Sequence, residues 1–187
     1  MRTPQPFIVP AAALRKVAGT VRHEDRHGVI EGLGTVGVVV PDGAEVDAQV
    51  TLSSYPGGIM ATGRVSAPWR GECRRCGGMV TGAVEAEVHE RFVIEGPGSE
   101  PGPAAEVDED AYVLVDDLLD LEPLARDAVL LELPLAPLCS EDCLGLCPQC
   151  GANLNLESCG CAPPADPRWS ALDVLRPLRD GEGGGLA

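Results

Sequence analysis

Eight cysteines, arranged in closely spaced pairs, constrain this chain more than any other feature of its sequence. They form four half-sites: Cys73 and Cys76, Cys139 and Cys143, Cys147 and Cys150, and Cys159 and Cys161. Two of these pairs have Cys-x-x-Cys spacing, which in structural zinc sites forms a tight turn that aims both thiolates at one point. Because four thiolates complete a tetrahedral site, the spacing predicts two zinc ions.

Three other uses of paired cysteines have to be weighed against zinc. Disulfides are disfavoured, because the opening MRTPQPFIVPAAAL is not a secretory signal and the cytoplasm, where we therefore expect the protein, keeps thiols reduced. Thiol exchange also uses Cys-x-x-Cys, but no obvious helix follows Cys76 to open a thioredoxin-like unit. An iron–sulfur cluster would take the same ligands and stays open as an alternative.

The sequence allows two ways of sharing the thiolates between two ions. In the first, Cys147, Cys150, Cys159 and Cys161 hold one ion, and Cys73, Cys76, Cys139 and Cys143 hold the other. In the second, the four cysteines from 139 to 150 hold one ion. The first is preferred, because it gives the isolated pair at 73 and 76 a partner pair.

Charge is unevenly distributed along the chain. The formal net charge is -15, and residues 83–122 carry thirteen acidic side chains against one basic side chain. A chain with one lysine, 14 basic side chains against 29 acidic ones and a pI near 4.4 lacks overall the excess of cations that neutralises phosphates in nucleic-acid complexes. A basic protein is therefore the easier partner. A membrane span is excluded, because no apolar stretch approaches the roughly 20 residues that a bilayer requires.

Period-two alternation of apolar and polar side chains predicts strands. The segments 28–40, 45–54, 59–67 and 79–94 show this pattern or are rich in valine, with glycine-containing turns between them. The fold class predicted is α+β: a curled antiparallel β-sheet or partly open barrel with one main helix and a C-terminal zinc-knuckle region. The first cysteine pair then lies in the turn between two strands.

The remaining segments complete the predicted domain organisation. Residues 1–138 form a mixed α/β core domain with an acidic loop at about 95–110, whose glycines, prolines and acids leave almost nothing to bury. Leucines near helical spacing predict a helix capped by Asp116 or Asp117, with a first turn or kink at Pro123. Residues 139–179 form the cysteine-rich segment with a short closing helix, and residues 180–187 a disordered tail.

The chain resembles the YceD family, whose members are associated with accumulation of the large-subunit (23S) ribosomal RNA. The similarity lies in the Cys-Arg-Arg-Cys pair, the acidic loop, VDDLLDLEPLARDAVLLELPLAPLC, and CLGLCPQCGANLN with DPRWSALDVL. It implies a mixed α/β domain and a role in ribosome biogenesis without an assigned catalytic activity. Some branches of the family lack the CPQCG segment, which supports an independent first site at residues 73, 76, 139 and 143.

No catalytic constellation can be assembled from the sequence, which predicts a non-enzyme. His23, His27 and His89 are interpreted as surface or satisfied histidines, and the run Asp108 to Asp110 as a solubilising loop rather than a site for hard metals. The expected partner is a ribosomal precursor, either its rRNA or a basic ribosomal protein. The candidate contacts for RNA or another partner are Arg64, Arg70, Arg74 and Arg75. A thiol-redox or RNA-processing enzyme is the alternative, and the oligomeric state is left open.

Overall fold

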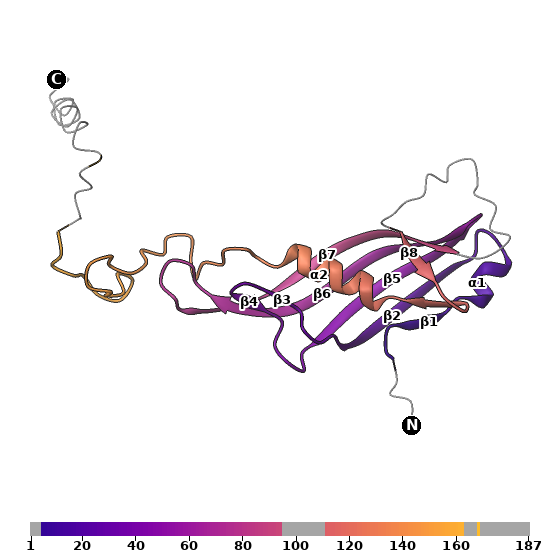
Figure 1. Ribbon diagram of the computed structural model, residues 1–187, viewed down its shortest axis with the longest axis horizontal. Coiled ribbons are helices and arrows are strands. Elements are labelled where there is room, and N and C mark those ends of the chain that lie inside the picture. The colour runs from indigo at the N-terminus through magenta and orange to yellow at the C-terminus, as the bar shows by residue number, and fades with distance from the viewer. Residues whose placement is uncertain (1–4, 95–110, 163–167, 169–187) are drawn as a thin grey trace, which may run out of the picture. The chain divides into compact units, whose positions relative to one another are not determined.

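A computed structural model describes residues 5–94, 111–162 and 168 of the chain. The chain divides into two units, residues 1–141 and residues 142–187. The first unit contains all the helices and strands described below (Figure 1). Their bounds are β1 Ile8–Pro10, α1 Ala12–Lys16, β2 Val21–Val29, β3 Gly34–Thr35, β4 Val38–Val39, β5 Glu45–Tyr55, β6 Gly58–Glu72, β7 Met79–Ile94, β8 Tyr112–Leu114, β9 Leu118–Asp120 and α2 Glu122–Glu132.

A seven-stranded sheet forms the main layer of the first unit. The long strand β6 pairs with β5 and β4 on one edge and with β7 on the other, while β2 adds to β5 and β3 to β4. All of these pairs are antiparallel, and only β8 runs parallel to its neighbour β7. Among the described strands, β2 and β8 do not pair with each other, so the sheet is open. The predicted antiparallel sheet is confirmed, whereas a curled sheet or barrel is not.

The alternation of side chains along β5, β6 and β7 builds the core. Along most of their length these strands bury alternate residues on one face, for example Val46, Ala48, Val50 and Leu52 on β5. The intervening residues are mostly polar and lie on the outer face. A second layer covers the buried face: α2 runs along β6 and β7, and the small sheet of β1 and β9 contributes Val9 and Leu119 to the same core (Figure 1).

The edge strand β2 departs from this pattern. Its face on the side of the buried residues of β5 carries Arg22, Glu24 and Arg26, which lie opposite Leu52, Val50 and Ala48. Arg22 Nε lies 2.6 Å from Glu24 Oε1, and Arg26 Nη2 lies 2.5 Å from Glu24 Oε2. Arg22 also donates to the carbonyl of Pro10 at 2.9 Å. Charged side chains at inward positions of an edge strand are one way in which natural sheets discourage pairing with other chains.

The predicted strand over 28–40 is wrong in extent. Residues 30–33 form a turn after β2, and the chain then folds into the short hairpin of β3 and β4. Gly32 and Gly37 explain the change of direction, because both adopt positive φ angles, of 70° and 90°. Gly32 and Gly37 therefore mark turns within a segment whose valines predict one continuous strand.

The start predicted for the main helix is also wrong. Asp116 and Asp117 do not cap a helix; they form the two-residue turn between β8 and β9, with φ angles of 51° and 58°. Such left-handed angles at both central residues are those of a tight β-hairpin turn. The helix begins at Glu122, with Pro123 in its first turn, where a proline costs no hydrogen bond.

The described part of the second unit is a small set of turns around cysteines. Leu146 and Asn153 form an isolated antiparallel bridge, and the backbone N–H of Leu154 donates to the carbonyl of Gly145 at 2.9 Å. Asn155 donates to the sulfur of Cys143 at 3.3 Å. The predicted acidic loop at 95–110, most of the closing helix and the tail at 180–187 lie outside the described residues.

Candidate metal centres

The first cysteine pair lies in the loop between β6 and β7, as predicted. The backbone N–H of Cys73 donates to the carbonyl of Gly78 at 2.7 Å, and the N–H of Gly77 donates to the carbonyl of Cys73 at 2.8 Å. Gly77 closes this turn with a φ angle of 70°. These bonds fold the loop into a tight turn that brings the sulfurs of Cys73 and Cys76 close together.

A segment that follows α2 lies against this loop. The backbone N–H of Arg74 donates to the carbonyl of Pro137 at 2.9 Å, and the Arg75 guanidinium donates to the carbonyl of Glu141 at 3.0 Å. The sulfurs of Cys76 and Cys139 are 3.7 Å apart. With Cys143, the ligand atoms of this set all lie within 4.8 Å of one another. We call Cys73, Cys76, Cys139 and Cys143 the first cluster.

The second cluster consists of Cys147, Cys150, Cys159 and Cys161, whose sulfurs also lie within 4.8 Å of one another. Its turn repeats the hydrogen bonds of the first. The N–H of Cys147 donates to the carbonyl of Ala152 at 2.8 Å, and the N–H of Gly151 donates to the carbonyl of Cys147 at 2.9 Å. Gly151 has a φ angle of 74°, close to that of Gly77. Both Cys-x-x-Cys turns are therefore closed by the same pair of backbone hydrogen bonds.

Hydrogen bonds to the sulfurs shift the pKa values of the thiols in both clusters. Bonds from backbone N–H groups, chiefly that of Cys139 for Cys73 and those of Cys150 and Gln149 for Cys147, lower the pKa of each thiol to about 6. Hydrogen bonding with Cys150 and Cys147 raises the pKa of Cys161 to about 12. For Cys159 the N–H of Cys161 favours the thiolate, but hydrogen bonding with Cys147 and burial outweigh it and raise its pKa. Each cluster thus contains one thiol that ionises readily near neutral pH.

The donor sets fit a tetrahedral metal ion bound by four sulfurs. With Zn–S bonds of about 2.3 Å, tetrahedral geometry sets neighbouring sulfurs about 3.8 Å apart. The separation of 3.7 Å between Cys76 and Cys139 matches that value. Such a site leaves no coordination position for water, so its chemical effect is to hold loops together rather than to activate a substrate. Zinc and iron–sulfur clusters share this ligand chemistry, and zinc stays a prediction.

The structure groups the eight cysteines as the first of the two predicted partitions does. Each cluster combines one Cys-x-x-Cys turn with one other pair, Cys139 and Cys143 or Cys159 and Cys161. The clusters could hold metal ions.

The four arginines predicted to contact RNA or another partner do not form one patch. Arg64 lies in the middle of β6 and pairs with Glu85, with 3.0 Å between Nε and Oε1. Arg70 lies six residues further along the same strand, which corresponds to about 20 Å. Arg74 and Arg75 are exposed in the loop that carries the first cluster. The arginines are therefore spread along one strand and its loop.

The histidines lie away from the cysteines. His23 and His27 on β2 and His89 on β7 are all exposed on the outer face of the sheet, and His23 contacts the Thr51 hydroxyl at 2.9 Å. Their interpretation as surface or satisfied side chains agrees with this placement. Asp108, Glu109 and Asp110 lie outside the described residues. Sequence reasoning missed a pocket beside Arg70, although the closely spaced glycines at 32, 34 and 37 signalled turns there.

Comparison with known proteins identifies the family. The model of the family "Large ribosomal RNA subunit accumulation protein YceD" matches residues 61–176, which include all eight cysteines. An uncharacterized protein of Mycobacterium tuberculosis is 37% identical over 179 residues, which cover 94% of this chain and 84% of the relative. The chain therefore belongs to the YceD family.

Plant relatives carry the family's functional name. Large ribosomal RNA subunit accumulation protein YCED homolog 1, chloroplastic, of Arabidopsis thaliana is 28% identical over 160 residues, covering 73% of this chain and 50% of the relative. The homolog of the same name from Zea mays is 45% identical over 53 residues, covering 28% of this chain and 18% of the relative. No solved structure matches the chain. Within the described residues, no helix is both long enough and apolar enough to cross a bilayer.

Proposed function

We propose that this protein is a non-enzymatic factor in biogenesis of the large ribosomal subunit, and that it supports rRNA accumulation by binding a component of the ribosomal precursor. The names of the family and of its plant members suggest the process. The observation that carries the non-enzymatic role is the closed donor set of each cysteine cluster. Two four-sulfur sets on matching turns are suited to fixing a binding scaffold and leave no open position for catalysis.

A basic ribosomal protein is the partner that the charges favour. Six exposed carboxylates lie on the outer face of the sheet, and of these only Glu85 forms an ion pair among the described residues, with Arg64. They are Asp25, Glu45, Asp47, Glu72, Glu85 and Glu87. Because the arginines are dispersed and the chain is strongly acidic, affinity driven by RNA phosphates would be low. Opposite charge would steer a lysine- and arginine-rich protein to this face.

Co-sedimentation tests the proposal. The protein should sediment with large-subunit precursor particles, and after extraction it should bind the fraction of basic ribosomal proteins rather than protein-free rRNA. Replacing Asp25, Asp47 and Glu87 by lysine should abolish binding, while Lys16→Glu on α1 should leave it unchanged. Binding to protein-free rRNA that these replacements strengthen would shift the proposal to an RNA partner. Absence from all precursor particles would overturn it.

A thiol-dependent or RNA-processing enzyme is the second candidate. The observation in its favour is the low pKa of Cys73 and Cys147, because a thiolate at neutral pH serves thiol exchange as well as metal binding. Incubation with precursor rRNA separates the candidates. Cleavage that requires magnesium and stops with EDTA would indicate a processing enzyme. Activity lost in Cys73→Ser but not dependent on magnesium would indicate thiol chemistry, and no turnover in either assay supports the binding factor.

A further inference from the structure

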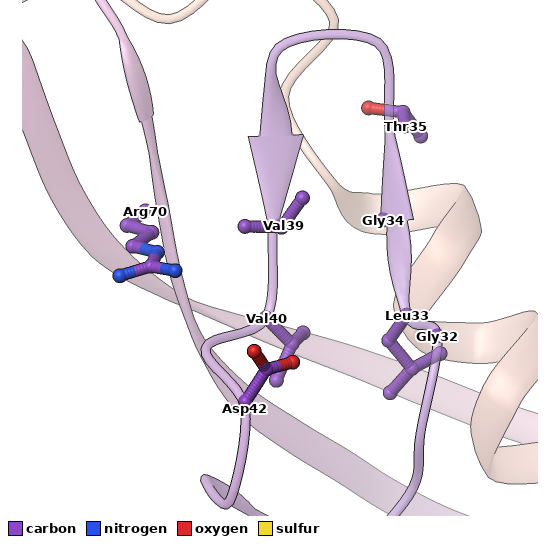
Figure 2. A pocket seen from close by; sticks show the side chains of 8 residues that line it. All are labelled: Gly32, Leu33, Gly34, Thr35, Val39, Val40, Asp42 and Arg70. Atoms are coloured by element: carbon purple, nitrogen blue, oxygen red, sulfur yellow. The ribbon is translucent and has the colours of Figure 1, made fainter.

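A pocket of about 450 Å³ opens between the β3–β4 hairpin and the end of β6 (Figure 2). The buried side chains of Leu33 and Val40 line it together with the half-exposed Val39. Arg70 from β6 and Asp42 from the turn after β4 supply its charged groups. The volume lies within the range of roughly 300 to 1,000 Å³ that is usual for small-molecule sites. All of its lining residues belong to the first unit.

The two charged side chains of this pocket are unpaired. Neither the Arg70 guanidinium nor the Asp42 carboxylate makes an ion pair with any residue that the structure describes. Both are exposed, so water can solvate them. A ligand that displaces this water has to offer acceptors to the guanidinium and donors to the carboxylate. It also has to present an apolar or flat surface to the valine and leucine side chains.

We propose that this pocket binds a guanine base. Guanine carries two acceptors, O6 and N7, on one edge, and a guanidinium donates to both at once in the commonest specific contact between proteins and DNA bases. Its N1–H and N2–H donors lie on the adjacent edge and match the two oxygens of a carboxylate, which can accept two parallel hydrogen bonds. The faces of the ring then pack against Val39, Val40 and Leu33.

The other bases match the Arg70 guanidinium and the Asp42 carboxylate less well. Adenine has an amino donor between single acceptors, so it can offer one hydrogen bond to each charged group. Cytosine offers an acceptor pair but only one amino group to a carboxylate. Uracil has one N–H donor between two carbonyls. Guanine is therefore the base that satisfies both the guanidinium and the carboxylate in two-point contacts.

The glycine at position 34 keeps the pocket open. A Cβ at this position would lie 2.8 Å from Val39 Cγ1 and 3.0 Å from the carbonyl oxygen of Val38. Substitution by alanine would therefore displace Val39, whose side chain lines the pocket. The two strands of the hairpin can approach this closely only because position 34 is a glycine. The substitution Gly34→Ala therefore alters the shape of the pocket without changing its charges.

Binding of nucleosides to the full-length protein tests the inference. Guanosine should bind more tightly than adenosine, cytidine or uridine in calorimetric titrations. Arg70→Lys, which keeps the charge but loses the two-point contact, and Asp42→Asn should each weaken guanosine binding roughly tenfold or more. Gly34→Ala should weaken it as well. Lys16→Ala removes one positive charge on α1 and should change nothing, and thermal unfolding of each variant checks its fold.

Two further titrations identify the source of the base. GMP and a single-stranded oligonucleotide with one guanine are compared with guanosine: tighter binding of GMP indicates a free nucleotide, and tighter binding of the oligonucleotide indicates unpaired RNA. Equal binding of the four nucleosides, no binding of guanosine, or unchanged affinity in Arg70→Lys and Asp42→Asn would overturn the inference. It is independent of the proposed function, because co-sedimentation with precursors through the acidic face requires neither residue.

Discussion

The indole ring of Trp69 on β6 lies directly against Gly82, its partner residue on β7. A Cβ at position 82 would come within 2.8 Å of the ring atoms Cε2 and Cζ2. Cross-strand packing of an aromatic ring on a glycine supports both residues, since the ring shields backbone that a glycine leaves uncovered. This contact lies in the part of the β6–β7 pair that leads into the loop of the first cluster.

Replacing Gly82 by alanine should therefore destabilise the first unit. The added methyl group has to displace the indole, and overpacking of this kind costs typically 1–3 kcal/mol. Urea denaturation monitored by tryptophan fluorescence would measure the loss. Thr81→Ala, a change at the exposed neighbouring position, should stay within about 0.5 kcal/mol of the wild type. Equal stability of the two variants would contradict the packing described.

The grouping of the cysteines makes a prediction about metal content. Elemental analysis of the purified wild-type protein should give two equivalents of zinc. Replacing Cys73 and Cys139 by serine removes ligands from the first cluster alone, so one equivalent should remain. Replacing Cys139 and Cys147 removes one ligand from each cluster and should eliminate both. Retention of one equivalent in this second variant would show that the two residues share an ion.

Metal binding at the second cluster should release protons and weaken as the pH falls. The pKa of Cys147 is about 6, so this thiol is largely ionised at pH 7, whereas the raised pKa values of Cys159 and Cys161 keep those two protonated. A metal ion has to displace their protons, and acid competes with it for the sulfurs. Calorimetry of zinc binding to Cys73→Ser in buffers of different ionisation enthalpy should show release of at least two protons. Heats that do not depend on the buffer would contradict this.

Tyr112 should make stability depend on pH in the alkaline range. Burial, reinforced by its hydrogen bond of 2.7 Å to Asp127 Oδ2, raises the pKa of the phenol well above its usual value. In the unfolded chain the phenol ionises near pH 10, so its contribution is complete below that pH and is lost as the pH rises further. Tyr112→Phe should lose about 1 kcal/mol at pH 7. The difference from the wild type should shrink above pH 10 in denaturation curves, and parallel pH profiles would argue against this role.

The β8–β9 turn offers a stabilising substitution. Asp116 adopts a left-handed backbone that glycine reaches without steric cost, so Asp116→Gly should keep or raise stability, by up to about 1 kcal/mol. Asp120 is the contrasting control, because its carboxylate accepts a hydrogen bond of 2.9 Å from the N–H of Glu122 at the start of α2. Asp120→Gly should lower the midpoint of thermal unfolding. A loss of stability in both variants would be inconsistent with the turn geometry.

The longer strands could be predicted from the sequence, but the short elements could not. Period-two alternation predicts 79–94 and all of β5 except its last residue, Tyr55, because each of these strands has one buried face and one solvated face. The spacing of Leu118 with Leu121 and Ala125 is helical and predicts a place for Leu118 in the main helix. Its place in β9 depends instead on pairing with β1, which is far away in the sequence and leaves no local periodic signal.

The grouping of the cysteines followed from spacing, whereas the pocket depended on tertiary structure. A Cys-x-x-Cys turn is local, so its hydrogen bonds can be anticipated from a few residues. Arg70 and Asp42 lie far apart in the sequence and come to one pocket only because β4 pairs with β6. Closeness in the sequence likewise predicts one patch of arginines, but an extended strand spaces Arg64 and Arg70 too widely to act on one phosphate.

The ion-paired face of β2 has a consequence for how this protein behaves when it is concentrated. A strand of a second molecule that joined the open edge of β2 would have to pack beside Arg22, Glu24 and Arg26 and exclude their water. Removing water from these charged groups costs free energy, and an apolar strand has no polar side chains to compensate for the loss. The nine residues of this edge strand are thus protected against the repeated intermolecular strand pairing that leads to amyloid fibrils.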